Sequence, residues 1–138
     1  MNVSLENRDG HLDPRLEANK KTVMAFYEAG LNNKDFEAAS KFIGDRYVQH
    51  NPLIADGIDG FKTFLGFLKE TFPGLRGEIK KVLAEGDYVI LHAHGVRVPG
   101  DRGSAIIDIF KLENGKIVEH WDVMQPIPES AVNQNGMF

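Results

Sequence analysis

The chain has 138 residues, of which 42% are hydrophobic and 26% are charged, with a formal net charge of -4 and no cysteine. This length suits one domain, and the missing cysteine excludes disulfides, thiolate metal sites and cysteine nucleophiles. The acidic balance without Lys/Arg runs argues against a nucleic-acid partner, and no apolar run reaches the ~20 residues that cross a bilayer. We therefore expect a cytoplasmic protein without membrane or nucleic-acid partners.

The N-terminal segment is polar and lacks the apolar stretch of a signal peptide. We expect residues 1–13 to be a flexible lead-in, residues 14–128 to form a single domain, and residues 129–138 to be a C-terminal tail.

Helical patterns fill the first half of the domain. Asp13 followed by Pro14 predicts a helix start, and this helix should end near Gly30 and the Asn32–Asn33 pair. Asp35 can cap a shorter helix that ends at Gly44.

A short extended piece covers residues 46–50. A third helix is predicted over residues 58–72, where apolar side chains recur at helical spacing before Pro73–Gly74.

Strand patterns fill the second half, at residues 76–86, 88–98, 104–113 and 116–125. Asn114–Gly115 between the last two is a strong hairpin signal. Helices followed by strands predict an α+β fold with an antiparallel sheet that three N-terminal helices cover on one face.

The hairpins predict which strand residues face each other. A two-residue turn at Asn114–Gly115 pairs Asp108 with Trp121 and Phe110 with Glu119. Centring the preceding loop on Asp101 pairs His94 with Asp108 and His92 with Phe110. A slip of one residue in that loop would move every contact to the other face.

With both registers, one face carries aromatic, imidazole, amide and carboxyl groups: His92, His94, Asp108, Phe110, Trp121 and Gln125. The opposite face is mostly aliphatic and includes His120, with Asp122 also outside, unless a β-bulge before Trp121 reverses them. Because the helices can cover only one non-polar face, we expect a homodimer through the outer face.

Asp108 lies between Ile106-Ile107 and Ile109-Phe110, so the sequence predicts a desolvated carboxylate. Desolvation raises the pKa of a carboxyl group and makes it a stronger base. A neighbouring His94 could donate a hydrogen bond or shuttle a proton, with His92 as the competing assignment. This pairing suits proton abstraction next to a carbonyl group.

A metal site is a weaker interpretation. The spacing His92-x-His94 places two imidazoles on one strand face, as in cupin metal sites, but the glutamate expected shortly afterwards is missing. We predict no metal.

The segments "RYVQHNP" at 46–52 and "DIFKLENGKIVEHWDVMQPIP" at 108–128 resemble the SnoaL-like polyketide cyclase family of the nuclear transport factor 2-like superfamily. The resemblance covers about residues 15–128 and implies a cone-shaped sheet wrapping three helices around a deep pocket. It also implies cofactor-free intramolecular aldol condensation, with Asp108 as general base and His94 assisting.

We expect His50, His92, Phe110, Trp121 and Gln125 to bind the substrate, with His50 at the pocket mouth. A role for His50 in stabilising the turn before Asn51-Pro52 competes with this.

Other functions on the same fold stay open. One is an isomerase, and another is an epoxide hydrolase, which needs a water between a carboxylate, an Asn and a Tyr, plus an acidic residue paired with Arg. A third is a small-ligand-binding dimer without catalysis.

Overall fold

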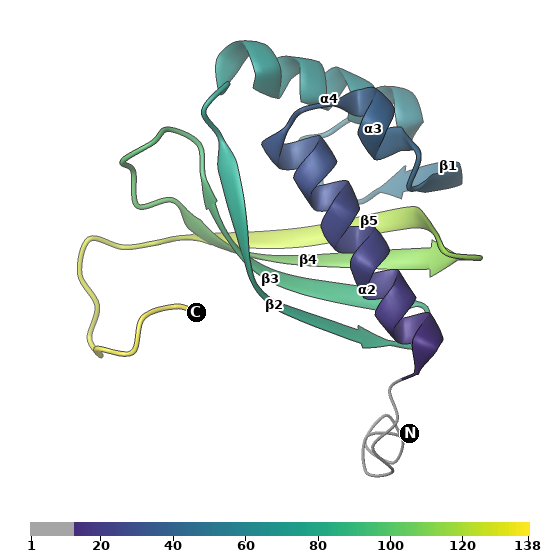
Figure 1. Cartoon of the computed structure of the whole chain (residues 1–138). Helices are drawn as coiled ribbons and strands as arrows, with labels where there is room; N and C mark the ends of the chain where they lie inside the picture. Colours follow the sequence, from purple (N-terminus) through teal and green to yellow (C-terminus); the bar gives the residue numbers. More distant parts are fainter. Residues whose placement is uncertain (1–12) are drawn as a thin grey trace.

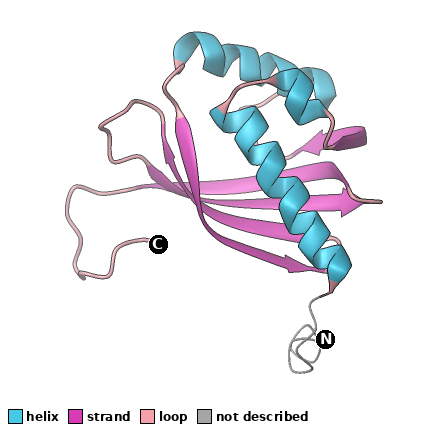
Figure 2. Cartoon of the chain, in the orientation of Figure 1, coloured by secondary structure: helices cyan, strands magenta, loops and turns pink. Residues whose placement is uncertain are grey.

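The computed structural model describes residues 13–138, so the predicted lead-in lies outside the described residues except for Asp13. Helices lie on one face of a five-stranded sheet (Figures 1 and 2). The predicted α+β fold is therefore confirmed. In chain order the elements are α2 (Pro14–Tyr27), η1 (Glu28–Asn32), α3 (Phe36–Ser40), β1 (Ile43–Gln49), α4 (Gly57–Thr71), β2 (Arg76–Glu85), β3 (Tyr88–Val96), β4 (Ser104–Glu113) and β5 (Lys116–Pro126).

Both predicted N-caps of the first two helices are present. The side chain of Asp13 accepts a hydrogen bond from the backbone N–H of Arg15 at 2.9 Å, and Asp35 accepts one from Ala38 at 3.0 Å. Each bond satisfies a backbone donor that the first helical turn leaves unpaired. The second helix is shorter than predicted, because it ends at Ser40 and the chain enters β1 at Ile43.

The strand order across the sheet is β1-β5-β4-β3-β2. Strands β2 to β5 form an antiparallel meander, as expected. The short extended piece that precedes α4 becomes β1, which pairs in parallel with β5 and places Gln49 opposite His120. The sheet is therefore antiparallel except at this edge.

The inner face of the sheet is the face that the helices cover, and the opposite face is called the outer face. Val89, Leu91 and Ala93 of β3 are fully buried on the inner face. They belong to a core between the sheet and the helices that also contains Val23, Phe26, Tyr27, Ala39, Ile43, Tyr47, Phe61, Leu65, Leu68, Leu75, Phe110, Leu112 and Ile117.

At the free edge of the sheet, η1 is attached directly to β2. The Asn32 side chain donates from Nδ2 to the carbonyl oxygen of Gly77 at 3.0 Å and accepts from the N–H of Gly77 at 2.7 Å. One amide thus satisfies both backbone groups of a residue on an edge strand.

The predicted register between β3 and β4 is wrong. Asp108 pairs with Leu91, whereas His94 pairs with Ala105 and His92 with Ile107. The connection is longer than assumed, because pairing begins only at Gly95 and Ser104. The strand register is therefore shifted by an odd number of residues relative to the prediction. This shift puts both histidines on the outer face, away from Asp108.

His94 contributes to this loop instead. Its Nε2 donates to the carbonyl oxygen of Arg102 at 2.7 Å, which ties the loop to the strand.

The predicted register between β4 and β5 is correct at the turn and wrong beyond it. Glu113 pairs with Lys116 across Asn114–Gly115, but the register then shifts between Lys111 and Leu112. Val118 is the extra residue, and this β-bulge places Asp122 opposite Asp108.

The described C-terminal tail turns back toward the outer face. The N–H of Ile127 donates to the carbonyl oxygen of Gly103, and the ring of Phe138 lies 5.3 Å from that of His92 and 5.0 Å from that of His94. Within residues 13–138, no helix is both long and apolar enough to cross a membrane.

Two glycines of α4 provide a test of this packing. A Cβ at Gly60 would lie 1.9 Å from the carbonyl oxygen of Ala55, whereas a Cβ at Gly66 would meet nothing within 4 Å. We expect Gly60→Ala to lower the free energy of unfolding by about 1–3 kcal/mol and Gly66→Ala to raise it by about 0.5–1 kcal/mol. Urea unfolding of both variants measures the difference, and equal stabilities would contradict the packing.

Candidate active site

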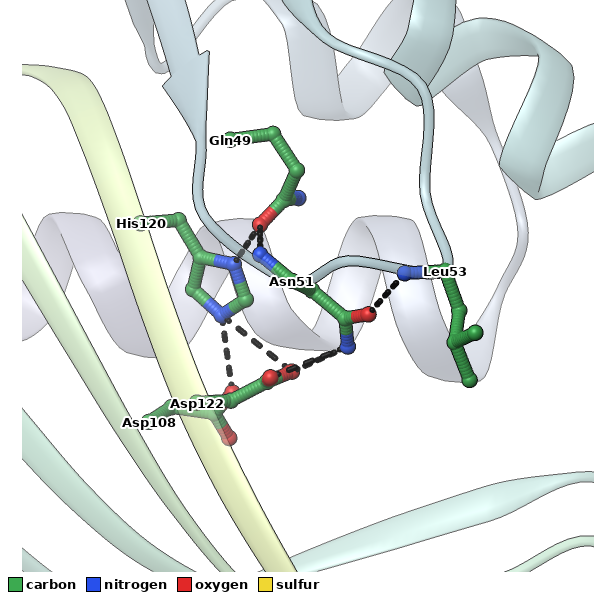
Figure 3. A network of polar contacts seen from close by, with 6 residues as sticks. All are labelled: Gln49, Asn51, Leu53, Asp108, His120 and Asp122. Atoms are coloured by element: carbon green, nitrogen blue, oxygen red, sulfur yellow. Dashed lines mark hydrogen bonds and ion pairs between the residues drawn. The ribbon is translucent and has the colours of Figure 1, made fainter.

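Asp108 of β4 and His120 of β5 form a hydrogen-bonded pair on the inner face of the sheet (Figure 3). His120 Nε2 lies 2.9 Å from Asp108 Oδ1, and each residue is only 6% exposed. Burial raises the pKa of the Asp108 carboxyl, although the hydrogen bond from His120 and its charge act in the opposite direction. The sequence therefore predicted correctly that Asp108 is a buried carboxyl group.

Gln49 of β1 fixes which nitrogen of His120 carries a hydrogen. Gln49 Oε1 accepts a hydrogen bond from the backbone N–H of Asn51 at 2.9 Å, which identifies this atom as the oxygen of the amide. The same oxygen lies 2.8 Å from His120 Nδ1, so Nδ1 must be the donor. His120 Nε2 and Asp108 Oδ1 then share a single hydrogen.

Asp122 is the second carboxylate of the cluster. Its Oδ2 lies 3.8 Å from His120 Nε2. Asn51 Nδ2 donates to both oxygens of Asp122, at 2.9 and 3.1 Å, and Asn51 Oδ1 accepts from the backbone N–H of Leu53 (Figure 3). The loop after β1 therefore holds Asp122 in place.

Aromatic rings enclose the histidine. The Tyr47 ring is stacked on that of His120 at 6.4 Å, and Phe110 lies 4.9 Å from it. Burial, and then the charges of Asp108 and Asp122, raise the pKa of Tyr47, so this phenol stays protonated. The apolar surroundings strengthen every charge interaction inside the cluster.

Asp108, His120 and Asp122 could also hold a metal ion, since one ligand atom from each lies within 4.8 Å of the others. Two carboxylates and one imidazole suit a divalent cation. Each of the three ligand groups already has a partner within the network of Figure 3. The predicted absence of a metal stays a prediction.

Most of the predicted substrate-binding residues lie elsewhere. Phe110 shares the inner face with Asp108, as expected. Trp121 and Gln125 pair with the outer-face residues Ile109 and Ala105, because the bulge reverses the faces of β5.

His50 is on the outer side as well. Its ring is stacked on Trp121 at 4.7 Å, and its Nε2 lies 2.6 Å from Glu119 Oε2. His50, His92, His94, Trp121 and Gln125 are therefore not in contact with the Asp108–His120 pair.

The residues that the sequence analysis missed are His120, Asp122, Gln49 and Asn51. The bulge that brings the first two inside stands in the sequence analysis only as the alternative to the predicted register. The sequence contains one signal for it: the predicted register pairs Phe110 with the charged Glu119, and two apolar residues, Ile117 and Val118, stand next to each other before it. Both are buried in the structure. Two consecutive apolar residues break the alternation of a regular strand.

Comparison with known families agrees with this architecture. Residues 21–128 match the model of the SnoaL-like polyketide cyclase family. No curated protein sequence matches the chain.

Solved structures share the fold. TsrD from Streptomyces laurentii superposes with a TM-score of 0.67 at 23% identity, covering 83% of this chain and 91% of that protein. A SnoaL-like polyketide cyclase candidate from Jannaschia sp. CCS1 gives 0.67 at 21% identity, covering 82% and 89%. A cystatin-fold protein from Novosphingobium aromaticivorans gives 0.65 at 20% identity, covering 76% and 97%.

Asp108→Asn should change how stability depends on pH. Because the pKa of Asp108 is raised in the folded protein, the folded state keeps a proton that the unfolded chain loses above about pH 4. The wild type therefore loses stability as pH rises through this window, and the variant does not. We expect the stability of the variant relative to the wild type to increase from about pH 4 toward neutral pH, measured by urea unfolding at a series of pH values.

Asp45→Asn is the matched control, since the Asp45 side chain is 88% exposed. Its stability should follow that of the wild type across the pH range. An Asp108→Asn curve that also ran parallel to the wild type would contradict a perturbed Asp108.

Proposed function

The chain belongs to the SnoaL-like polyketide cyclase family, and we propose that it is a cofactor-independent enzyme that removes a proton next to a carbonyl group. The substrate is a small or medium organic compound. Intramolecular aldol condensation and isomerisation both begin with this step. The observation that carries the proposal is the buried Asp108–His120 hydrogen bond on the inner face.

The single hydrogen shared by Asp108 and His120 explains how the pair acts as a base. With the hydrogen on Nε2, Asp108 is a carboxylate beside an imidazolium, and it can accept a proton from carbon. Asp122, 3.8 Å from Nε2, stabilises the positive charge of the imidazolium. His120 thus takes the assisting role that the sequence analysis assigned to His94.

Gln49 and Asn51 are positioning residues in this proposal. Gln49 accepts the hydrogen bond from His120 Nδ1, and Asn51 donates a hydrogen bond that fixes the Asp122 carboxylate. Fixed partners of this kind let the charges change during a reaction with little rearrangement.

An epoxide hydrolase remains the closest enzymatic alternative. The structure brings Asn51 to a carboxylate, which that chemistry needs. However, no arginine forms an ion pair with Asp108 or Asp122 among residues 13–138. The proton-abstraction proposal therefore fits the cluster better.

The apolar side chains of the outer face favour a second copy of the chain as partner. Ile107, Ile109, Trp121 and Val123 share this face, and Val123 is 69% exposed. Such an apolar face on a strand surface favours association. We therefore propose a homodimer through the outer face, next to the tail that ends at Phe138.

Deuterium exchange tests the base without knowledge of the product. In D2O, the wild type should catalyse exchange of hydrogens next to the carbonyl in some members of a panel of ketones and 1,3-dicarbonyl compounds, followed by NMR. Asp108→Asn should reduce this rate about 10²- to 10⁴-fold, because it removes the proton acceptor but keeps the side-chain shape.

Asp45→Asn should exchange at the wild-type rate. Equal exchange by wild type and Asp108→Asn would reject Asp108 as the base. Binding of panel members without any exchange would favour the ligand-binding dimer instead.

Light scattering tests the dimer. The wild type should have the mass of two chains, and Val123→Glu should shift it toward one chain, because a charge would be buried at the interface. Val132→Glu is the control, since Val132 is fully exposed in the tail. A monomeric wild type, or identical behaviour of both variants, would contradict the proposed interface.

A further inference from the structure

A cleft of about 450 Å³ lies between the C-terminal end of α2 and the start of β2. This volume is within the range of small-molecule sites. The lining combines apolar and charged side chains with the imidazole of His94 and one buried phenol. It includes Met24, Ile79, Glu28, Arg76, Glu78, His94 and Tyr27. No residue of the Asp108–His120–Asp122 cluster lines the cleft directly.

Tyr27 is the residue that makes this cleft unusual. Its side chain is buried, and its Oη is the single buried side-chain polar atom without a hydrogen-bond partner within residues 13–138. Leaving a hydroxyl group buried and unpaired destabilises the folded state, because the group has lost its hydrogen bonds to water. Buried polar groups in proteins generally have a partner, so we expect one for this hydroxyl group that is not part of the protein.

The phenol is held against the sheet by the absence of a side chain at Gly77. A Cβ at Gly77 would lie 2.1 Å from Tyr27 Oη. Gly77 is also the residue that Asn32 binds through both backbone groups, so its own N–H and carbonyl are occupied. The Tyr27 hydroxyl thus lies buried against this wall of the cleft without a hydrogen-bond partner among the described residues.

The electrostatics define the kind of ligand. Burial, and then the negative charge of Asp108, raise the pKa of Tyr27, so the phenol is a donor at neutral pH. The charged side chains that line the cleft are two glutamates and one arginine, and Arg76 lies 4.0 Å from Glu28. Glu78 is paired with Lys80, so the charges around the cleft are matched, which favours a neutral ligand with a hydrogen-bond acceptor.

We propose that this cleft binds a neutral carbonyl compound and that Tyr27 Oη donates a hydrogen bond to the carbonyl oxygen of the ligand. A donor at this oxygen also stabilises the negative charge that develops on it when a proton next to the carbonyl is removed. The choice of a carbonyl ligand rests on the proposed function, whereas the site itself rests on the cleft and the unpaired phenol.

Tyr27→Phe tests the inference, with acetophenone as the probe, because it is a neutral carbonyl compound whose oxygen accepts a hydrogen bond and NMR titration measures its binding. We expect the variant to bind the probe about tenfold more weakly than the wild type, since it lacks the donor. Its stability to urea should equal or exceed that of the wild type, because no bond within the protein is lost.

Tyr88→Phe is the control. Tyr88 is 42% exposed and lies beside Trp121 on the outer face, so this variant should bind the probe as the wild type does. In NMR titrations of the wild type, the probe should shift the backbone amide signals of Asn32 and Gly77.

Unchanged probe affinity in Tyr27→Phe, or shifts confined to other regions, would overturn the inference. A loss of stability in this variant would also overturn it, because Oη would then have a partner within the protein. None of these measurements uses turnover. Failure of the Asp108→Asn exchange experiment would therefore reject the proposed base and leave the binding site standing.

Discussion

The extra residue in β5 determines which side chains meet inside the molecule. Because Val118 has no partner on β4, the residues after it are turned by one position, and His120 and Asp122 point to the inner face. Without this bulge, Asp108 would face the apolar helices without a histidine. Ile117 and Val118 are both buried, so the bulge is stabilised by core packing rather than by the ladder that it interrupts.

Two neighbouring carboxyl groups under a layer of helices have lost their hydrogen bonds to water and need partners within the protein. Asp108 is hydrogen-bonded to His120, and Asp122 accepts a hydrogen bond from Asn51. These partners come from β5 and from the loop after β1, so they are assembled only when the parallel strand has joined the sheet. A buried polar network that lacks one of its partners destabilises a protein more than apolar packing in the same place would. The presence of this network is therefore consistent with a chemical role.

Local signals located the elements, but long-range geometry decided the site. Asp13–Pro14, Asp35 and Asn114–Gly115 each specify structure within a few residues, and all were interpreted correctly. The loop between β3 and β4 depends on contacts such as the bond from His94 to Arg102, which no local pattern reveals. The burial of Asp108 could be predicted from its isoleucine neighbours. Its hydrogen-bond partner could not, because it depends on a β-bulge of one residue, which leaves only a weak signal in the sequence.

The amide of Asn32 also has a consequence for the behaviour of the protein in concentrated solution. An edge strand with free backbone groups is a template on which another chain can add a strand, and this can lead to aggregation. At Gly77 both groups are already bound, so a strand from another molecule would have to displace Asn32 before it could pair there. The same side chain that attaches η1 to the sheet thus protects the start of β2 against edge-to-edge growth.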